Sequence, residues 1–348
     1  MAMNRRRFLQ AAGALAAGAT AGLPLARAQD HKLRFADMHT HIGMYRDTQN
    51  VHEAMTKNGV LLISRKIVGD GAVIQRVPGK GLQMYRQPKP GELAQRYEAT
   101  LQRLNAQHKV DNLFAVTSAE TLARALRGSD PAVVIGVEGG DFLEGDLQRL
   151  ESARQQGIVH LQLVHYRVSE LGDISTERPQ HGGLTPFGKD VLRACNRLGM
   201  LVDVAHCTSE GIEQALSLSS KPMVYSHGHV TSTSPHYTQS NARARAIHRP
   251  LALQIAKQGG VIGIWPLGNV FPTLDAYAQA LMDTAEYLGA KHVAVSTDIP
   301  GLLQTPMPTY DAYPALEALL AKRGVKADDI ANLLGGNYLR VLGQALAV

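Results

Sequence analysis

Short apolar or β-branched runs alternate along this chain with stretches that have helical patterns. Eight such runs occur, at residues 33–36, 61–67, 132–137, 158–164, 201–204, 223–225, 261–264 and 292–295. Strands that alternate with helices form parallel sheets, because each helical crossover returns the next strand in the same direction. About eight units in 348 residues favour a (β/α)8 TIM-type barrel with inserted loops. An open doubly wound α/β sheet is the alternative that the pattern leaves open.

The segment at 185–199 shows why the connecting stretches are predicted to be helical. Thr185 can cap a helix, Pro186 suits its first position, apolar residues recur at helical spacing from 191 to 198, and Gly199 can end it. Two stretches fall outside the eight units: 113–116 could be an extra strand, and 75–90, with Gly and Pro, indicates an inserted loop. No repeat or low-complexity linker divides the rest of the chain, so we expect a single domain over 29–348.

The first 28 residues have the pattern of a secretory leader. Arg5–Arg7 precede an uncharged Ala/Gly/Leu stretch from 11 to 26, and Ala26-Arg27-Ala28 provides a small-residue exit. Paired arginines before Phe8 are typical of a twin-arginine signal, which directs folded proteins to export. A membrane anchor is the alternative, but the stretch is short and weakly apolar for a span. We therefore expect a periplasmic or otherwise exported protein with no membrane span after the leader.

The basic charge of the chain belongs largely to this leader. The formal charge is +6, and the leader holds four of the 36 basic side chains and none of the 30 acidic ones. The remainder is nearly neutral and has no basic run with interleaved aromatics, so nucleic acid is not expected as a partner. Only Cys195 and Cys207 are present, which excludes a disulfide framework.

Side chains that bind metals or carry protons stand at the carboxyl ends of the predicted strands. They are His39, His41, Glu138, His165, His206, His227 and Asp298. The carboxyl ends of barrel strands converge on one face, where the active sites of this fold form. We therefore expect these side chains to meet in one site.

Four imidazoles and one carboxylate suit two zinc-like ions. His39 and His41 are two residues apart, so an extended chain points both to the same side. His206 and His227 follow later strands, and the carboxylate of Glu138 can bridge two ions that keep open positions for water. Such a pair lowers the pKa of a bridging water and polarises the carbonyl that it attacks. The pattern predicts hydrolysis by a dinuclear-metal bridging hydroxide.

Structural alternatives exist for several of these residues. Glu138 could cap a helix, His165 could be a structural histidine, and Asp298 could be a turn or helix-cap residue before Pro300. Arg245 lies in an arginine-containing segment where an exposed loop position is the ordinary expectation.

The sequence resembles the membrane dipeptidase (renal dipeptidase) family of amidohydrolase-like metallopeptidases. The similar stretches are 134–140, 183–189, 196–206, 226–227, 296–298 and 335–341. The resemblance implies that His39 and the second residue after it bind one zinc, that His206 and His227 bind the other, and that Glu138 bridges them.

The same resemblance implies roles in catalysis and substrate binding. His165 would stabilise the tetrahedral oxyanion. Asp298 would hold the substrate amine and carry a proton to the leaving nitrogen. Arg245 would hold substrate oxygen atoms. The expected cofactors are two zinc ions or other divalent metals per chain, the expected substrate is a small dipeptide, and a homodimer is possible.

One position departs from the family pattern. The family has His-x-Asp at the first strand, whereas this chain has His39 and His41. A neutral imidazole in place of a carboxylate raises the net charge of the site by one, which would lower the pKa of a bridging water and change the affinity for the first ion. The stretch 47–90 also fails to match and should form loops above the first strands.

These observations predict an exported zinc-dependent dipeptidase. Two alternatives stay open: a hydrolase of another amide or ester, such as an N-acyl amino acid or a lactone, and a non-catalytic periplasmic binding protein. The histidine at position 41 supports the first alternative. The presence of both Asp298 and His165 argues against the second.

Overall fold

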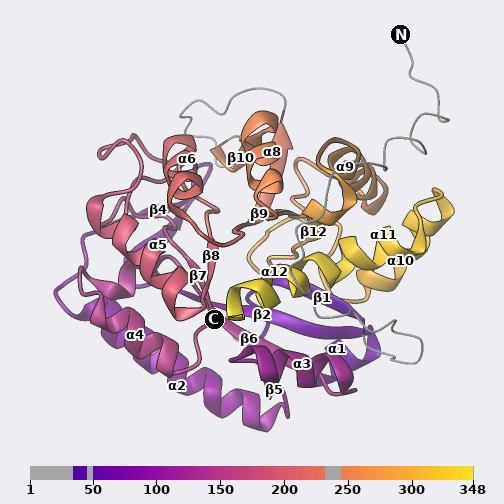
Figure 1. Cartoon of the computed structure of the whole chain (residues 1–348), viewed down its shortest axis with the longest axis horizontal. Coiled ribbons are helices and arrows are strands. Elements are labelled where there is room, and N and C mark those ends of the chain that lie inside the picture. The colour runs from indigo at the N-terminus through magenta and orange to yellow at the C-terminus, as the bar shows by residue number, and fades with distance from the viewer. Residues whose placement is uncertain (1–33, 45–49, 232–243, 348) are drawn as a thin grey trace. The chain divides into compact units, whose positions relative to one another are not determined.

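Eight parallel strands form the centre of the fold. The computed structural model describes residues 34–44, 50–231 and 244–347 (Figure 1). The predicted leader at 1–28 lies outside the described residues. The strands lie in the order β1 (Phe35–Thr40), β2 (Val60–Val68), β6 (Ala132–Glu138), β7 (His160–Gln162), β8 (Leu201–Asp203), β9 (Val224–Thr231), β11 (Val261–Ile264) and β12 (Val293–Val295), and each neighbouring pair is parallel.

The sheet curls until its two ends meet. Just past β12, the amide of Asp298 donates to the carbonyl of His39 over 2.9 Å, and the amide of His41 donates to the carbonyl of Ile299 over 2.7 Å. The nearly closed barrel confirms the predicted (β/α)8 fold, and the open doubly wound alternative is wrong. All eight predicted strands are present.

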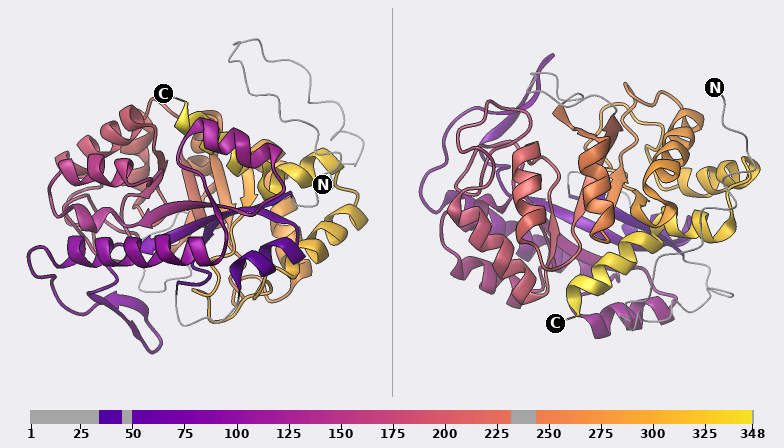
Figure 2. Two further views of the ribbon diagram at one scale, coloured as in Figure 1. Left: turned by 90° about the horizontal axis from the view of Figure 1, so that it is seen from below. Right: turned by 45° about the horizontal axis from the view of Figure 1, so that its top comes forward.

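Helices surround the strands (Figures 1 and 2). In chain order they are α1 (Val51–Lys57), α2 (Glu92–Val110), α3 (Ala119–Arg127), the short η2 (Gly140–Leu143), α4 (Gln148–Gln155), α5 (Pro186–Leu198), α6 (Ser209–Leu218), α8 (Arg249–Lys257), α9 (Leu274–Leu288), η3 (Ala290–His292), α10 (Ala312–Lys322), α11 (Ala327–Ala331), the π-helical turn η4 (Asn332–Gly336) and α12 (Asn337–Leu346). No helix of the described residues is both long enough and apolar enough to cross a membrane.

Helix α5 forms as its sequence predicts. The hydroxyl of Thr185 accepts from the amide of Gly188, Pro186 opens the helix, and Gly199 ends it with φ +69°. That left-handed conformation is costly for a residue with a Cβ, which is why glycine suits the position.

Two apolar clusters build the core. The larger one lies between the strands and the outer helices. The second fills the amino-terminal half of the barrel, where α12 packs across its end; it joins Ala36, Met38, Leu62, Val134, Val159, Leu201, Val224, Val261 and Ala294 to Tyr338, Val341, Leu342 and Ala345. Because apolar groups occupy this half, polar side chains gather at the carboxyl end.

Three short pairings lie outside the eight-strand order. β3 (Ile74–Val77) and β4 (Gly81–Met84) form an antiparallel hairpin that projects from the barrel (Figure 2, left). The insertion predicted at 75–90 is thus present, but much of it is a hairpin rather than an irregular loop. β5 (Phe114–Ala115) pairs with β6, as the possible extra strand at 113–116 suggested, and β10 (Ala246–His248) pairs with β9.

Candidate metal centre

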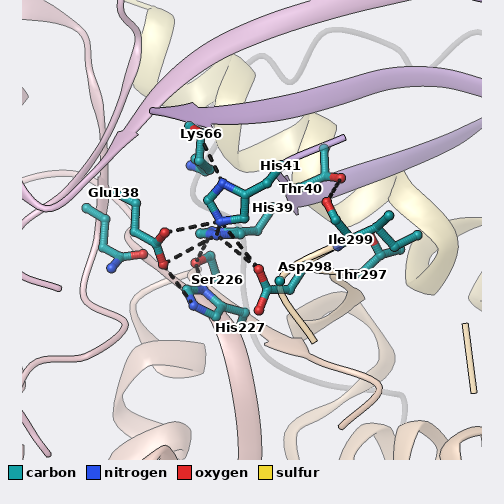
Figure 3. Close-up of polar contacts among 12 residues, drawn as sticks. His39, Thr40, His41, Lys66, Glu138, Ser226, His227, Thr297, Asp298 and Ile299 are labelled. Carbon is teal, nitrogen blue, oxygen red and sulfur yellow. Dashed lines mark hydrogen bonds and ion pairs between the residues drawn. The ribbon is translucent and has the colours of Figure 1, made fainter. Parts of the chain in front are cut away.

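The seven predicted site residues meet at the carboxyl end of the barrel. His39 and His227 lie within β1 and β9, because these strands run further than the sequence indicates, and Glu138 ends β6. The other four occupy the turns that follow β1, β7, β8 and β12. All seven are buried, with side chains that face one another, as Figure 3 shows for five of them; the seven are His39, His41, Glu138, His165, His206, His227 and Asp298.

The carboxylate of Glu138 lies between two pairs of imidazoles. The Nε2 atoms of His39 and His41 are 3.3 Å apart, and those of His206 and His227 are 3.2 Å apart. Oε1 of Glu138 lies 3.2 Å from Nε2 of His227 and 3.5 Å from Nε2 of both His39 and His206, while Oε2 lies 3.2 Å from Nε2 of His41. Ligands on a zinc ion at about 2.0–2.1 Å are roughly 3.3 Å apart at tetrahedral angles, so these spacings fit metal coordination.

The hydrogen bonds of His41 also favour a cation. Its Nδ1 lies 3.1 Å from the carbonyl of Lys66, which can only accept, so Nδ1 carries the proton and Nε2 of the neutral ring offers a lone pair. That lone pair faces Nε2 of His39 and the oxygens of Glu138 and Asp298. Divalent cations fit this gathering of electron-donating atoms.

Ser226, which the sequence analysis missed, connects the two imidazole pairs. Its hydroxyl oxygen lies 3.2 Å from Nδ1 of His39 and 2.8 Å from Nδ1 of His227 (Figure 3). A hydroxyl has two lone pairs, so it can accept from both rings and turn both Nε2 atoms toward Glu138. Its position directly before His227 was the available signal.

Asp70, also missed, holds His165. Oδ1 of Asp70 accepts from Nδ1 of His165 over 2.7 Å, and Oδ2 accepts from the amide of Tyr166 over 2.8 Å. Like the other site residues, Asp70 stands just past a predicted strand, and this place could have identified it.

The protonation of His165 suits a hydrogen-bond donor. Its Nε2 lies 3.3 Å from Oε1 of Glu138. Burial lowers the pKa of His165, but the charges of Asp70 and Glu138 raise it to about 9. The ring therefore presents an N–H to the site and can stabilise negative charge on an oxygen.

Asp298 is held in an unusual backbone conformation. Its φ is +53° and that of His206 is +69°, in the left-handed region that side chains disfavour. Oδ1 of Asp298 lies 3.4 Å from Nε2 of His41. Burial raises the pKa of Asp298 to about 7, so this carboxyl group can take up and release a proton near neutrality.

Arg245 is buried in the site, which corrects the ordinary expectation of an exposed loop arginine. Its Nη1 lies 2.5 Å from Nε2 of His206, and its Nη2 donates to the carbonyl of His227 over 2.6 Å. The guanidinium also lies 4.9 Å from the ring centre of Trp265. The neighbouring residues 232–243 lie outside the described part of the chain.

Eight of these residues line one cavity of about 750 Å³. Ligand pockets of a few hundred to about 1,000 Å³ hold small organic molecules. His41, Glu138, His165, His206, His227 and Asp298 form its inner wall together with Arg245 and Trp265.

The family model of the membrane dipeptidases, peptidase family M19, matches residues 77–348. The chain belongs to the membrane dipeptidase family. The matched range covers the site residues from Glu138 onward, whereas His39 and His41 precede it. Membership of this family confirms the resemblance found in the sequence.

Curated relatives agree with the family, and a solved structure shares the fold. The dipeptidase aclJ of Aspergillus oryzae is 29% identical over 61% of this chain and 51% of its own length, and the dipeptidase verJ of Clonostachys rogersoniana is 27% identical over 70% and 64%. The chain thus matches between half and two thirds of these relatives. A metallopeptidase from Rhodobacter sphaeroides, liganded with a phosphinate mimic of L-Ala-D-Ala, has a TM-score of 0.75 and 17% identity over 90% of this chain and 99% of its own. At that identity the likeness shows the shared fold.

Proposed function

We propose that this member of the membrane dipeptidase family is a zinc-dependent dipeptidase that hydrolyses the peptide bond of small dipeptides. The observation that carries the proposal is the Glu138 carboxylate between two imidazole pairs, each with Nε2 atoms 3.2–3.3 Å apart. His39 and His41 would hold one zinc ion, His206 and His227 the other, and Glu138 both. Relatives that are named dipeptidases, and the dipeptide mimic bound to the Rhodobacter sphaeroides protein, support the substrate class.

Metal ions at these positions would supply Lewis acidity, which activates water and polarises the scissile carbonyl. The chain's own residues would provide the other functions. His165 donates from Nε2 to the carbonyl oxygen as negative charge develops there. Asp298 would hold the substrate amine and carry a proton to the leaving nitrogen. Arg245 would hold substrate oxygen atoms.

A second candidate is a hydrolase of another amide or ester on the same site. Its support is His41, which replaces an anionic ligand by a neutral one and so alters the charge that faces the substrate. Asp298→Asn separates the two candidates. A dipeptidase that needs the free amino group held by Asp298 should lose kcat/KM on free dipeptides in this variant. A hydrolase of another amide or ester does not need that group, so it should act on amino-blocked analogues with or without the substitution.

We also propose that the protein is exported and forms a homodimer. Residues 1–28 would act as a twin-arginine leader, and residues 29–348 would form the single hydrolase domain. Export of the folded chain fits the absence of any disulfide between Cys195 and Cys207, which are both free and buried. Family resemblance is the support for the homodimer.

The decisive experiment is a zinc titration of the purified, chelator-stripped chain, with bound metal counted by mass spectrometry and hydrolysis followed on a dipeptide panel. Activity that returns near two zinc ions per chain supports the proposal. Uptake of zinc without dipeptide turnover favours another amide or ester, or a binding protein. Failure to take up zinc in stoichiometric amount overturns the site assignment.

A further inference from the structure

The cavity extends beyond the metal centre to an outer wall that carries only positive charge. Arg76, Arg96 and Arg103 line this wall, whereas the two carboxylates that face the cavity, Glu138 and Asp298, both belong to the centre. Within the described residues, no acidic side chain lines the outer wall. The cavity that contains the metal centre is therefore also lined by three guanidinium groups, which we name the arginine wall.

The arginine wall is built from two separate elements. Arg96 and Arg103 are seven residues apart on α2, which places them on one face of the helix two turns apart. Arg76 comes from β3 of the hairpin, and its Nη2 lies 3.4 Å from the carbonyl of Gly301, three residues past Asp298. Arg76 thus comes from the β3–β4 hairpin of the insertion, whereas Arg96 and Arg103 come from the helix that follows it.

Gly71 brings the head of Arg96 close to the centre. A Cβ at Gly71 would lie 3.3 Å from Nε and 3.5 Å from Nη2 of Arg96, so the guanidinium packs against this glycine. Gly71 directly follows Asp70, whose carboxylate holds His165. The positive charge of Arg96 therefore stands beside the loop that carries Asp70, the residue that positions His165.

Arginines of this region differ in whether a carboxylate neutralises them. Arg86, just past the hairpin, forms a 2.5 Å ion pair with Glu92. Arg76, Arg96 and Arg103 form no ion pair with any carboxylate in the described residues. Unpaired like charges around a concave surface repel one another and attract anions. Guanidinium groups match the planar geometry of a carboxylate in particular.

We infer that the arginine wall is a subsite for a substrate carboxylate, and that the preferred substrates are dipeptides with an acidic side chain. The inference rests on the proposed dipeptidase function and adds the substrate class. Arg245 and Asp298 would hold the two ends of the dipeptide backbone, which leaves the side-chain carboxylate for the arginine wall. Exposed pairs contribute modestly one by one, so we expect about a five- to tenfold preference from the three together.

Kinetics on matched substrates test the inference. The zinc-loaded chain is assayed with Glu-Ala and Ala-Glu against the uncharged isosteres Gln-Ala and Ala-Gln. We expect kcat/KM for at least one glutamate dipeptide to exceed that of its isostere about five- to tenfold. In Arg96→Gln/Arg103→Gln this difference should close, whereas Lys109→Gln, the same change at an exposed cation of α2 outside the cavity, should keep it. The difference should also shrink at 1 M salt, where the screening length falls to about 3 Å.

A binding measurement separates failure of the inference from failure of the proposed function. Trp265 is the single tryptophan of the chain and lines the same cavity, so its fluorescence reports binding to the metal-free protein. Tighter binding of the glutamate dipeptides that disappears in the double arginine variant supports the subsite, even without turnover. Equal binding and equal kcat/KM for glutamate and glutamine dipeptides overturn it. Absence of turnover for all four dipeptides counts against the proposed dipeptidase function instead.

Discussion

The two ends of the barrel are made of the same strands but have opposite chemistry. At the amino-terminal end, small and branched apolar residues such as Ala36, Val134 and Val261 pack against α12. At the carboxyl end, the same strands and the turns after them place His39, Glu138 and other buried polar groups around a cavity. The comparison indicates that stability and chemistry are divided along the barrel axis, as is usual for this fold.

A buried polar layer separates the two ends. Lys66 and Asp203 are fully buried, and Asp203 lies 3.4 Å from Nε2 of His160. Burial lowers the pKa of Lys66 to about 7, although the negative charges of Asp203 and Glu138 act to raise it. The amides of Ala205 and Ser226 donate to Oδ1 of Asp203, which ties the turn after β8 to β9. The layer thus connects the apolar end to the residues that hold the metal ligands.

Glu138→Gln should give the largest effect at the carboxyl end. The amide removes the charge that faces all four imidazoles, so we expect zinc binding to weaken and kcat/KM to fall at least about 10³-fold, equivalent to several kcal/mol. Zinc counting and dipeptide hydrolysis measure the two effects. Glu213→Gln, an exposed position on α6, is the matched control. Full activity in Glu138→Gln would contradict the shared-ligand role.

Leu342→Ala tests the amino-terminal end. Leu342 is fully buried in the cluster that closes the barrel, so its truncation should lower the free energy of unfolding by about 2–5 kcal/mol. Denaturant unfolding measures the loss, and Val110→Ala, at an 84% exposed position, provides the control. The zinc content and kcat of the folded variant should equal those of the parent chain. A large fall in kcat without loss of stability would break the division between the two ends.

Asp70→Asn should lower activity through His165. In the asparagine one of the two carboxylate oxygens becomes an NH2 group, which cannot accept, so the side chain can no longer accept from both Nδ1 of His165 and the amide of Tyr166. It also loses the negative charge that raises the pKa of His165. We expect kcat to fall about 10- to 100-fold while KM and zinc content change little. Steady-state kinetics with zinc counting check this, and Asp146→Asn, an exposed position, is the control. A rise in KM with unchanged kcat would assign Asp70 to substrate binding instead.

The sequence predicts the strands and the ligand set better than it predicts the contacts that hold the ligands in place. Local patterns fix the strands and α5, because capping residues, glycine stops and β-branched runs act within a few residues of themselves. The ligand set is predictable because each member follows a strand. Asp70 and Ser226 were missed because their roles depend on rings that are distant in sequence, 95 residues away for Asp70 and 187 for Ser226 and His39. The burial of Arg245 depends likewise on the packing of β9 and Trp265 around it.

Ser226→Ala should give the smallest effect of the series and also the most specific one. One hydroxyl accepts from a ring of each imidazole pair, so its loss should weaken both zinc ions together, by about tenfold each. Competition with a chelator measures the two affinities. Ser296→Ala removes a hydroxyl that is equally buried just past β12 and has no hydrogen-bond partner in the described part of the chain. It should therefore keep both affinities. If Ser226→Ala weakens only one ion, the hydroxyl serves one ring, and the two metal positions are held independently of each other.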